Sequence, residues 1–133
     1  MTKQFTLGKK ERLKSRKRIE LLFSKGKNFV STPYKIYYLV EKAKPGLQFG
    51  VGVSGKNFKK SVDRNRIKRL TREAYRLQRS MLQEKVKTVN KELSIFFIYT
   101  GKELPDFITA KEKVAVALNK LSKILDENIS SHS

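Results

Sequence analysis

The clearest pattern along the chain lies between Lys56 and Arg79, where apolar and basic positions separate at the period of an α-helix. Counted at about 100° per residue, the apolar positions recur three and four residues apart and form one stripe. They are Ile67, Leu70, Ala74, Leu77 and Met81. Arginines and lysines four residues apart occupy the opposite side. The pattern predicts a helix from Lys60 to about Glu84 that frays through Lys91, with one face on a core and one face of cations.

Strand patterns flank this helix. The range 28–41 is rich in aromatic and β-branched residues, which favours strands, and Pro33 predicts a break between two short ones. The range 48–54 predicts another strand, whose glycines favour a close approach by a helix or a nucleic acid strand. The almost continuously apolar range 93–99 predicts a strand covered on both faces.

Two further helices are expected near the ends of the chain. The range 13–25 predicts a short helix with Ser15 as a possible N-cap and a glycine directly after it as the stop. The range 109–128 predicts a longer helix that opens with a capping box formed by Thr109 and Glu112.

The resulting order is helix, strands, helix, strand, helix. This order predicts an α+β fold, a two-layer sandwich of one small sheet with helices mostly on one face. If the strands at 48–54 and 93–99 are parallel neighbours, the basic helix is the crossover of a βαβ unit, for which the right hand is usual. We expect a single domain over residues 1–133, with flexible ends at 1–12 and 129–133.

The composition of the chain supports a binding role for the basic face. The chain has 31 basic and 12 acidic side chains, a formal net charge of +19, which is far more than solubility needs and attracts phosphate-bearing partners. Asp63 and Glu73 are the only acids between Lys56 and Arg79. A merely solvated helix face mixes both signs, and arginine forks suit phosphate oxygens. Polyanion binding is therefore favoured over an ordinary soluble surface.

Aromatic rings among lysines are a second sign of nucleic acid binding. Alternation along a strand puts Tyr34 and Tyr38 on one face and Tyr37 on the other. Exposed rings beside cations hold single-stranded nucleic acid by stacking, at about 1–3 kcal/mol per base. A small domain also needs rings in its core, so the exposed ones stay undecided. The rings assigned to the core by default are Phe49, Phe96 and Phe97.

Catalytic chemistry finds no support in the residue types. Without cysteine, neither disulfides nor thiolate metal sites form, and the only histidine, His132, lies near the end of the chain. Carboxylates are scattered, so no metal site or protein active site is expected. There is no apolar run long enough for a membrane span and no hydrophobic segment typical of a secretory signal, so we expect no membrane partner and a cytoplasmic location.

The run from Arg64 to Glu73, RNRIKRLTRE, closely resembles the RNR signature of the bacterial ribonuclease P protein subunit. The residues before it, Val53, Ser54, Lys56 and Val62, are similar to the corresponding family segment. The segment around the first predicted helix is similar to the family's first helix at Leu13, Arg18, Ile19, Leu22, Phe23 and Gly26. The range 93–99 is similar to the family's last strand. The resemblance spans most of residues 7–125.

This resemblance implies a specific function. It implies a single RNA-binding domain with the derived element order and a left-handed crossover that carries the basic helix. Family members assemble with ribonuclease P RNA, which binds Mg²⁺ and hydrolyses the phosphodiester that releases the 5′ leader of precursor tRNA. The protein, expected as a monomer in the complex, would supply no catalytic residue and no organic cofactor, and would bind the leader in a cleft between the first helix and the sheet.

The resemblance also assigns site residues. Expected contacts to the RNA subunit are Lys56, Lys60, Arg64, Asn65, Arg66, Lys68, Arg69, Arg72 and Arg76. The leader cleft would be lined by Ile19, Phe23, Tyr34 and Tyr37. The chain departs from the family pattern at Ile19, where phenylalanine is common, at Gly55, which replaces a basic residue, and in a longer connection at residues 57–59. Arg66 projects toward the apolar side of the predicted helix, so it is expected either to anchor the helix or to contact RNA.

Other functions fit the charge alone. A ribosomal or RNA-chaperone-like protein would have this size and composition without the signature. A DNA-binding module would be expected as a compact helix-turn-helix, whereas this helix follows strands. A nuclease that acts without RNA lacks acid and base groups.

Overall fold

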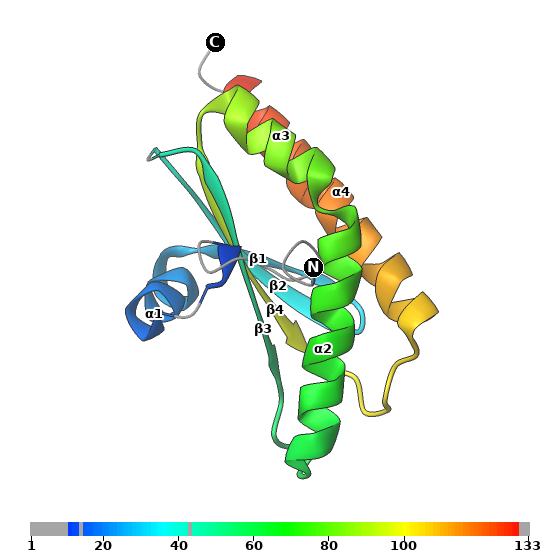
Figure 1. Ribbon diagram of the computed structural model, residues 1–133. Helices are drawn as coiled ribbons and strands as arrows, with labels where there is room; N and C mark the ends of the chain where they lie inside the picture. The colour runs from blue at the N-terminus through cyan, green and yellow to red at the C-terminus, as the bar shows by residue number, and fades with distance from the viewer. Residues whose placement is uncertain (1–10, 14, 43, 131–133) are drawn as a thin grey trace, which may run out of the picture.

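The computed structural model describes residues 11–13, 15–42 and 44–130, with side chains as far as Glu127. It is an α+β fold with helices on both faces of one sheet (Figure 1), which confirms the predicted class. The elements are α1 (Arg16–Lys25), β1 (Lys27–Ser31), β2 (Tyr34–Glu41), β3 (Gly46–Val53), α2 (Ser61–Gln78), α3 (Ser80–Val89), β4 (Glu92–Tyr99) and α4 (Phe107–Ser130).

The four strands lie in the order β1-β2-β4-β3. β1 and β2 form an antiparallel hairpin that turns at Thr32 and Pro33, as the proline predicted. β4 enters between β2 and β3, antiparallel to β2 and parallel to β3. α2 and α3 therefore form the connection of a βαβ unit, which confirms that the basic helix lies in a crossover.

The helices divide between the two faces of the sheet. α2, α3 and α4 lie together on one side, whereas α1 lies alone on the other (Figure 1). The hydrophobic core lies between the sheet and these three helices, and in it the Phe49 and Tyr75 rings stack with centroids 3.9 Å apart. None of the helices in the described part of the chain is long and apolar enough to cross a membrane.

The central helix differs from its prediction in length and in its buried face. α2 ends at Gln78 and α3 begins at Ser80, so two helices replace one. Leu77 and Met81, predicted for the buried stripe, are 49% and 48% exposed. The side chains of α2 that are buried are Ile67, Thr71, Ala74 and Tyr75.

The hydroxyl groups of Thr71 and Tyr34 explain why a polar residue lies on the buried face of α2. The Thr71 hydroxyl donates to the Ile67 carbonyl, at 2.8 Å between the oxygens, and the Tyr34 hydroxyl lies 2.8 Å from Thr71 Oγ1. Because the single Thr71 proton goes to the carbonyl, Tyr34 is the donor of the second bond. A hydroxyl satisfied in this way is buried at little cost, although a count of apolar residues leaves Thr71 out of the stripe.

The predicted cap of the first helix is confirmed, whereas the predicted cap of the last helix is not. In α1, Ser15 Oγ accepts from the backbone N–H of Arg18 at 3.4 Å, as expected of an N-cap. In α4, the predicted capping box of Thr109 and Glu112 is wrong. The helix begins earlier, and the Asp106 carboxylate accepts from the Thr109 N–H at 2.7 Å, which lowers the pKa of Asp106. An aspartate three residues ahead of Thr109 makes the stronger cap, because the acceptor is charged.

Candidate nucleic-acid interface

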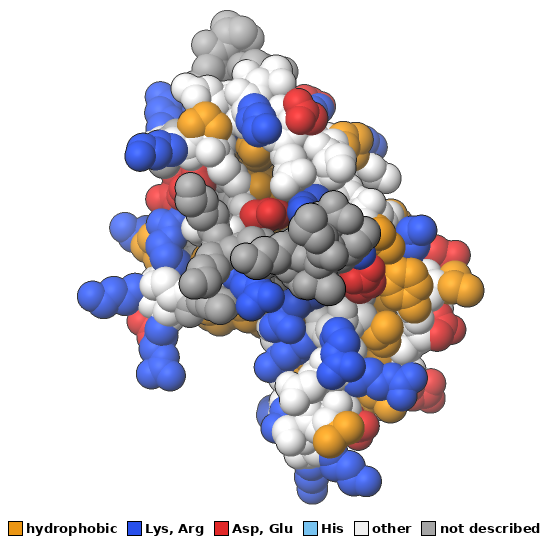
Figure 2. Space-filling model, in the orientation of Figure 1, with side chains coloured by type: hydrophobic (Ala, Val, Ile, Leu, Met, Phe, Trp, Pro, Cys, Tyr) orange, Lys and Arg blue, Asp and Glu red, His pale blue; other side chains and the backbone are white. Residues whose placement is uncertain are grey.

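The outer side of α2 and the turn before it carry a basic surface, here called the RNR surface. Its members are Lys56, Lys60, Arg64, Asn65, Arg66, Lys68, Arg69 and Arg72. All are exposed except Arg64 and Lys68, which are half-buried. Figure 2 shows lysine and arginine side chains gathered over α2 and over α1 on the same side of the molecule. Such a concentration of cations suits a phosphate backbone.

The longer connection before α2 is firmly anchored. Phe58 is buried, with its ring centroid 6.0 Å from that of Tyr99. The Asn57 side-chain amide donates to the carbonyls of Thr100 and Gly101, both at 3.2 Å. The residues that lengthen this connection therefore fix the start of α2 against the end of β4.

Arg64 takes part in the same anchoring. Its Nη1 donates to the carbonyl oxygens of Phe58 and Lys59, both at 2.8 Å. These bonds close the turn into α2 and leave only part of the guanidinium for a ligand. Arg64 therefore positions the RNR surface in addition to belonging to it.

Two other arginines of α2 have distinct surroundings. Arg66 is exposed, so of the two roles open to it the structure favours contact with a ligand over anchoring. Arg76, predicted as an RNA contact, has only 14% of its side chain exposed and forms an ion pair with Glu73. Glu73 lies three residues earlier on the same helix, where such pairs form readily. Arg76 is therefore not part of the exposed basic surface.

α1 is held on the opposite face of the sheet by a partly buried ion-pair network. Arg18 Nη2 lies 2.7 Å from Glu41 Oε1, 3.2 Å from Glu92 Oε1 and 3.0 Å from Ser94 Oγ. The bond to Glu41 is the main cause that raises the pKa of Arg18. Arg18 thus fixes α1 to β2 and β4 and is not available as a surface cation.

Between α1 and the sheet lies an aromatic cluster that includes two predicted leader-binding residues. The Phe23 ring on α1 meets Tyr37 of β2 at 4.7 Å and Phe96 of β4 at 5.5 Å, both edge to face. Phe23 is exposed, and Tyr37 and Phe96 are half-buried. Half-exposed rings in this arrangement can take an unpaired base against them.

Next to this cluster a hollow opens along β3, here called the α1 cleft. It is lined by Arg12, Leu13, Ile19, Phe49, Gly50, Val51, Arg72 and Phe96. Leu13 lies along the free edge of β3, where its N–H donates to the Phe49 carbonyl at 2.9 Å. The cleft places Ile19, a predicted leader contact, beside the Phe96 ring.

Glycines make room for this cleft. A Cβ at Gly50 would lie 2.8 Å from Phe96 Cδ2 and 3.1 Å from the Leu13 carbonyl oxygen. A Cβ at Gly52 would meet the same ring at 3.2 Å. The close approach expected at these glycines is made by the Phe96 ring and by the backbone of residue 13.

Two arginines without an acid stand at the cleft. Arg72 extends from α2, which covers the edge strand β3, and Arg12 comes from the segment along that edge. Burial lowers the pKa of Arg72, and the positive charge of Arg12 lowers it further. No carboxylate is among the described residues that line the cleft. Two like charges held together in this way favour binding of an anion such as a phosphate.

Tyr34 does not line the cleft, so its predicted leader contact is wrong. Its side chain is fully buried on the face toward α2, 5.4 Å from the ring centroids of Phe97 and Tyr99. Strand alternation placed Tyr34 and Tyr37 on opposite faces correctly, and the position of α1 decides which face is open. Tyr34 stabilises the core, and Tyr37 belongs to the aromatic cluster.

Sequence reasoning missed two residues of this site. Phe96 was assigned to the core, yet it faces α1, while its neighbour Phe97 is buried on the other face. Alternation between Phe96 and Phe97, together with glycines on the neighbouring strand, was the available signal. Arg12 fell in the range expected to be flexible, and nothing local predicts its bridge to the edge of β3.

We expect Gly50→Ala to narrow the cleft. The added methyl group would lie within contact of Phe96 and of a backbone carbonyl, so overpacking should lower the free energy of unfolding by about 1–3 kcal/mol and displace the Phe96 ring. Urea titration measures the first effect. Gly55→Ala is the matched control, because no atom lies within 4 Å of its added Cβ. Equal stability of the two variants would contradict the described packing.

The described residues provide no site for metal-dependent hydrolysis. No group of three or more histidine, cysteine, aspartate or glutamate side chains among them could hold a metal ion. Two acids that lie close together, Glu41 and Glu92, are both bound to Arg18. The cations and rings that the structure brings together at the RNR surface and the cleft are suited to binding RNA.

Comparison with known proteins decides the family. A family model described as Ribonuclease P matches residues 7–122. The chain belongs to the ribonuclease P protein family. It is 36% identical to the ribonuclease P protein component of Porphyromonas gingivalis over 120 residues, covering 89% of this chain and 88% of that one. It is 34% identical to the component of Thermotoga maritima over 130 residues, covering 93% and 98%.

Solved structures of ribonuclease P proteins have the same fold. The protein of Thermotoga maritima superposes with a TM-score of 0.61 at 28% identity, covering 85% of this chain and 96% of that one. The Staphylococcus aureus protein superposes with a TM-score of 0.65 at 19% identity, covering 84% and 94%. The family membership indicated by the RNR signature is confirmed.

Proposed function

We propose that this chain is the protein subunit of ribonuclease P and that it supports removal of the 5′ leader from precursor tRNA. The RNR surface binds the RNA subunit, and the α1 cleft with its aromatic cluster binds the leader. The protein acts as a monomer within the complex. Family membership supports this function, and the two surfaces supply its physical basis.

One observation carries the proposal. Arg72 belongs to the RNR surface and also lines the α1 cleft, so the two surfaces meet at the edge of β3. An RNA bound along α2 and a single strand bound in the cleft would therefore lie next to each other. This neighbourhood is what a subunit needs if it holds a leader beside a catalytic RNA.

The division of labour follows from the side chains. The protein contributes cations, rings and shape, which orient a strand and neutralise its phosphates. Hydrolysis of the phosphodiester is the task of the RNA subunit, with Mg²⁺ bound mainly by that RNA. The scattered acids of the chain, with Glu41 and Glu92 on Arg18, agree with this division.

Cleavage of precursor tRNA at low Mg²⁺ tests the proposal with four samples: buffer, protein alone, bacterial ribonuclease P RNA alone, and RNA with protein. We expect cleavage at the mature 5′ end only in the combined sample. Cleavage by protein alone would contradict an RNA-based reaction. The sample with protein alone is included because one similar structure is that of a Staphylococcus aureus ribonuclease P protein mutant described as defective in mRNA degradation activity.

The alternative is a ribosomal or RNA-chaperone-like protein with no part in cleavage. An RNA that is competent at high Mg²⁺ but is not stimulated by the protein at low Mg²⁺ would favour this alternative.

A further inference from the structure

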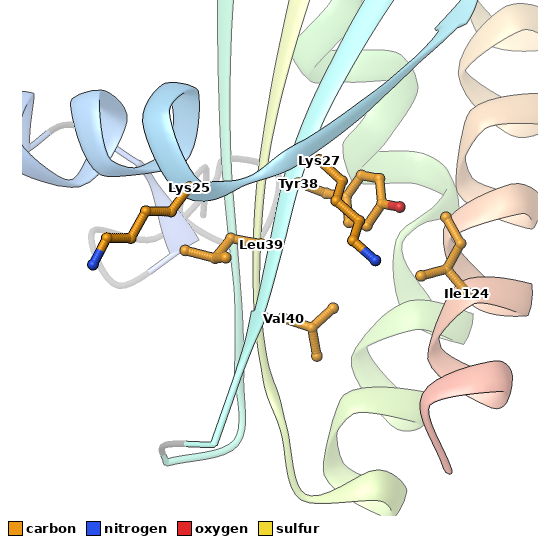
Figure 3. Close-up of a pocket in the computed structure, with 6 residues that line it drawn as sticks. All are labelled: Lys25, Lys27, Tyr38, Leu39, Val40 and Ile124. Carbon is orange, nitrogen blue, oxygen red and sulfur yellow. The ribbon is translucent and has the colours of Figure 1, made fainter. Parts of the chain in front are cut away.

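A second basic hollow, here called the β1 hollow, lies at the other edge of the sheet. It is lined by Lys25, Lys27, Tyr38, Leu39, Val40 and Ile124 (Figure 3). In the strand order, β1 and β3 are the two outer strands. The whole width of the sheet therefore separates the β1 hollow from the β3 edge, where Arg72 and the α1 cleft lie.

Two lysines are fixed at this edge by the backbone. Lys25 ends α1 and Lys27 begins β1, with only Gly26 between them. A Cβ at Gly26 would lie 2.4 Å from the Leu22 carbonyl oxygen and 2.7 Å from that of Tyr38. The chain is thus pressed against α1 and β2 at Gly26. Figure 3 shows Lys27 extending beside Tyr38 toward Ile124, and Lys25 extending to the other side of the strand.

A third lysine approaches from α4. Lys120 Nζ lies 4.6 Å from the ring centroid of Phe29, and that ring lies 5.9 Å from the ring of Tyr38. This cation–π contact holds the ammonium group over β1 next to the hollow. Two lysines, from the end of α1 and the start of β1, therefore line the hollow, and a third lysine from α4 lies beside it.

These three lysines are not neutralised by an ion pair with a described acid. None of the ion pairs between described residues involves Lys25, Lys27 or Lys120. Burial raises the pKa of Tyr38, and the negative charge of Glu127 raises it further, so one acid is felt at the hollow. Lys25 alone is explained by its place at the end of a helix, where a cation stabilises the dipole. Lys27 has no such local reason, and Lys120 is held by its contact with the Phe29 ring.

We propose that the β1 hollow is a second RNA-binding surface, which takes the phosphate backbone of ribonuclease P RNA. Lysine ammonium groups act as point charges on phosphates, and the apolar lining residues Leu39, Val40 and Ile124 offer no side-chain donor for reading bases. Binding is therefore independent of sequence and sensitive to salt. The proposal rests on the function proposed above and deepens it, since the RNA then contacts both outer edges of the sheet.

The test compares two triple variants in titrations of ribonuclease P RNA from low to high salt. Lys25→Gln/Lys27→Gln/Lys120→Gln removes the three cations, and the slope of log affinity against log salt should become shallower by about 2–3. Lys42→Gln/Lys87→Gln/Lys111→Gln removes the same charge from exposed positions outside the hollow and should leave the slope near that of the wild type. An equal change in both variants would attribute the effect to net charge and overturn the proposal.

Footprinting of the RNA separates this surface from the RNR surface. The nucleotides that lose protection in the triple variant should differ from those that lose it in Arg69→Ala. Wild-type binding with an unchanged triple variant would reject the β1 hollow alone, whereas no wild-type binding would reject the proposed function as well. Lys25→Gln/Lys27→Gln keeps the contact between Lys120 and Phe29, so a smaller loss of slope in this variant excludes misfolding as the cause.

Discussion

Binding of ribonuclease P RNA is expected to weaken by about 1–3 kcal/mol when Arg69 is replaced by alanine. Arg69 lies in the middle of α2, is exposed and forms no ion pair with another described residue. Its guanidinium is therefore available to a phosphate. The slope of log affinity against log salt should fall by about 0.7–0.9, the loss of one phosphate contact. Affinity measured at several salt concentrations tests both numbers.

Lys87→Ala is the matched control for Arg69→Ala. It removes one positive charge from an exposed position on α3, outside the RNR surface, and should change neither affinity nor slope appreciably. An unchanged slope in Arg69→Ala would contradict the assignment of the RNR surface. Arg64→Ala is a poorer test, because it also opens the turn that Phe58 and Lys59 make before α2.

Phe97→Ala is expected to lower the free energy of unfolding by about 3–5 kcal/mol. The ring is fully buried at the centre of the sheet, 5.2 Å from the centroid of Phe49 and 5.4 Å from that of Tyr34. Its removal leaves a cavity in the core between the sheet and the helices. This cost is a large part of the stability of an ordinary domain, so denaturant titration should detect a partly unfolded population without denaturant.

Phe96→Ala changes the neighbouring residue and should affect RNA binding more than it affects the free energy of unfolding. Phe96 faces α1 and the cleft, so most of the stability should remain. The preference for precursor tRNA over mature tRNA should fall instead, by about 1–3 kcal/mol if one base stacks there. Unfolding as severe as in Phe97→Ala, or an unchanged preference, would contradict the separation of the two faces.

The sequence predicted the architecture well because its local signals agree. Pro33 marks the hairpin turn, Gly26 stops α1, and the apolar range 93–99 becomes the central strand β4. The sequence made the parallel pairing of β3 with β4 only a conditional expectation, and the structure shows that they pair in this way. Patterns of period two and 3.6, together with turn residues, were sufficient for this level of detail.

The faces of the elements were harder to predict, because burial depends on partners far along the chain. Thr71 counts as polar, but Tyr34 and the Ile67 carbonyl satisfy its hydroxyl in the core. Phe96 counts as apolar, but it faces α1 beside a cleft. Hydrophobicity alone does not distinguish a ring in a core from a ring in a binding site.

The basic residues show the same limit of local reasoning. Arg18 and Arg76 resemble RNA-binding cations in the sequence, whereas the structure engages them with Glu41, Glu92 and Glu73. The two acidic partners of Arg18 come from β2 and β4, so spacing along the chain gives no sign of them. Exposure separates the arginines that are available to RNA from those that hold elements together.

The central position of β4 sets the order in which the protein can fold during synthesis. β2 and β3 follow each other along the chain but do not pair, and each needs β4 as its neighbour. A nascent chain that ends before Glu92 contains the β1–β2 hairpin, β3 and α2, but lacks the strand that joins β2 to β3. Pairings this distant form slowly because long loops must close first. The arginine-rich helix is thus translated after three strands of the sheet but before the strand that joins them, so its cationic face leaves the ribosome before the sheet can be completed.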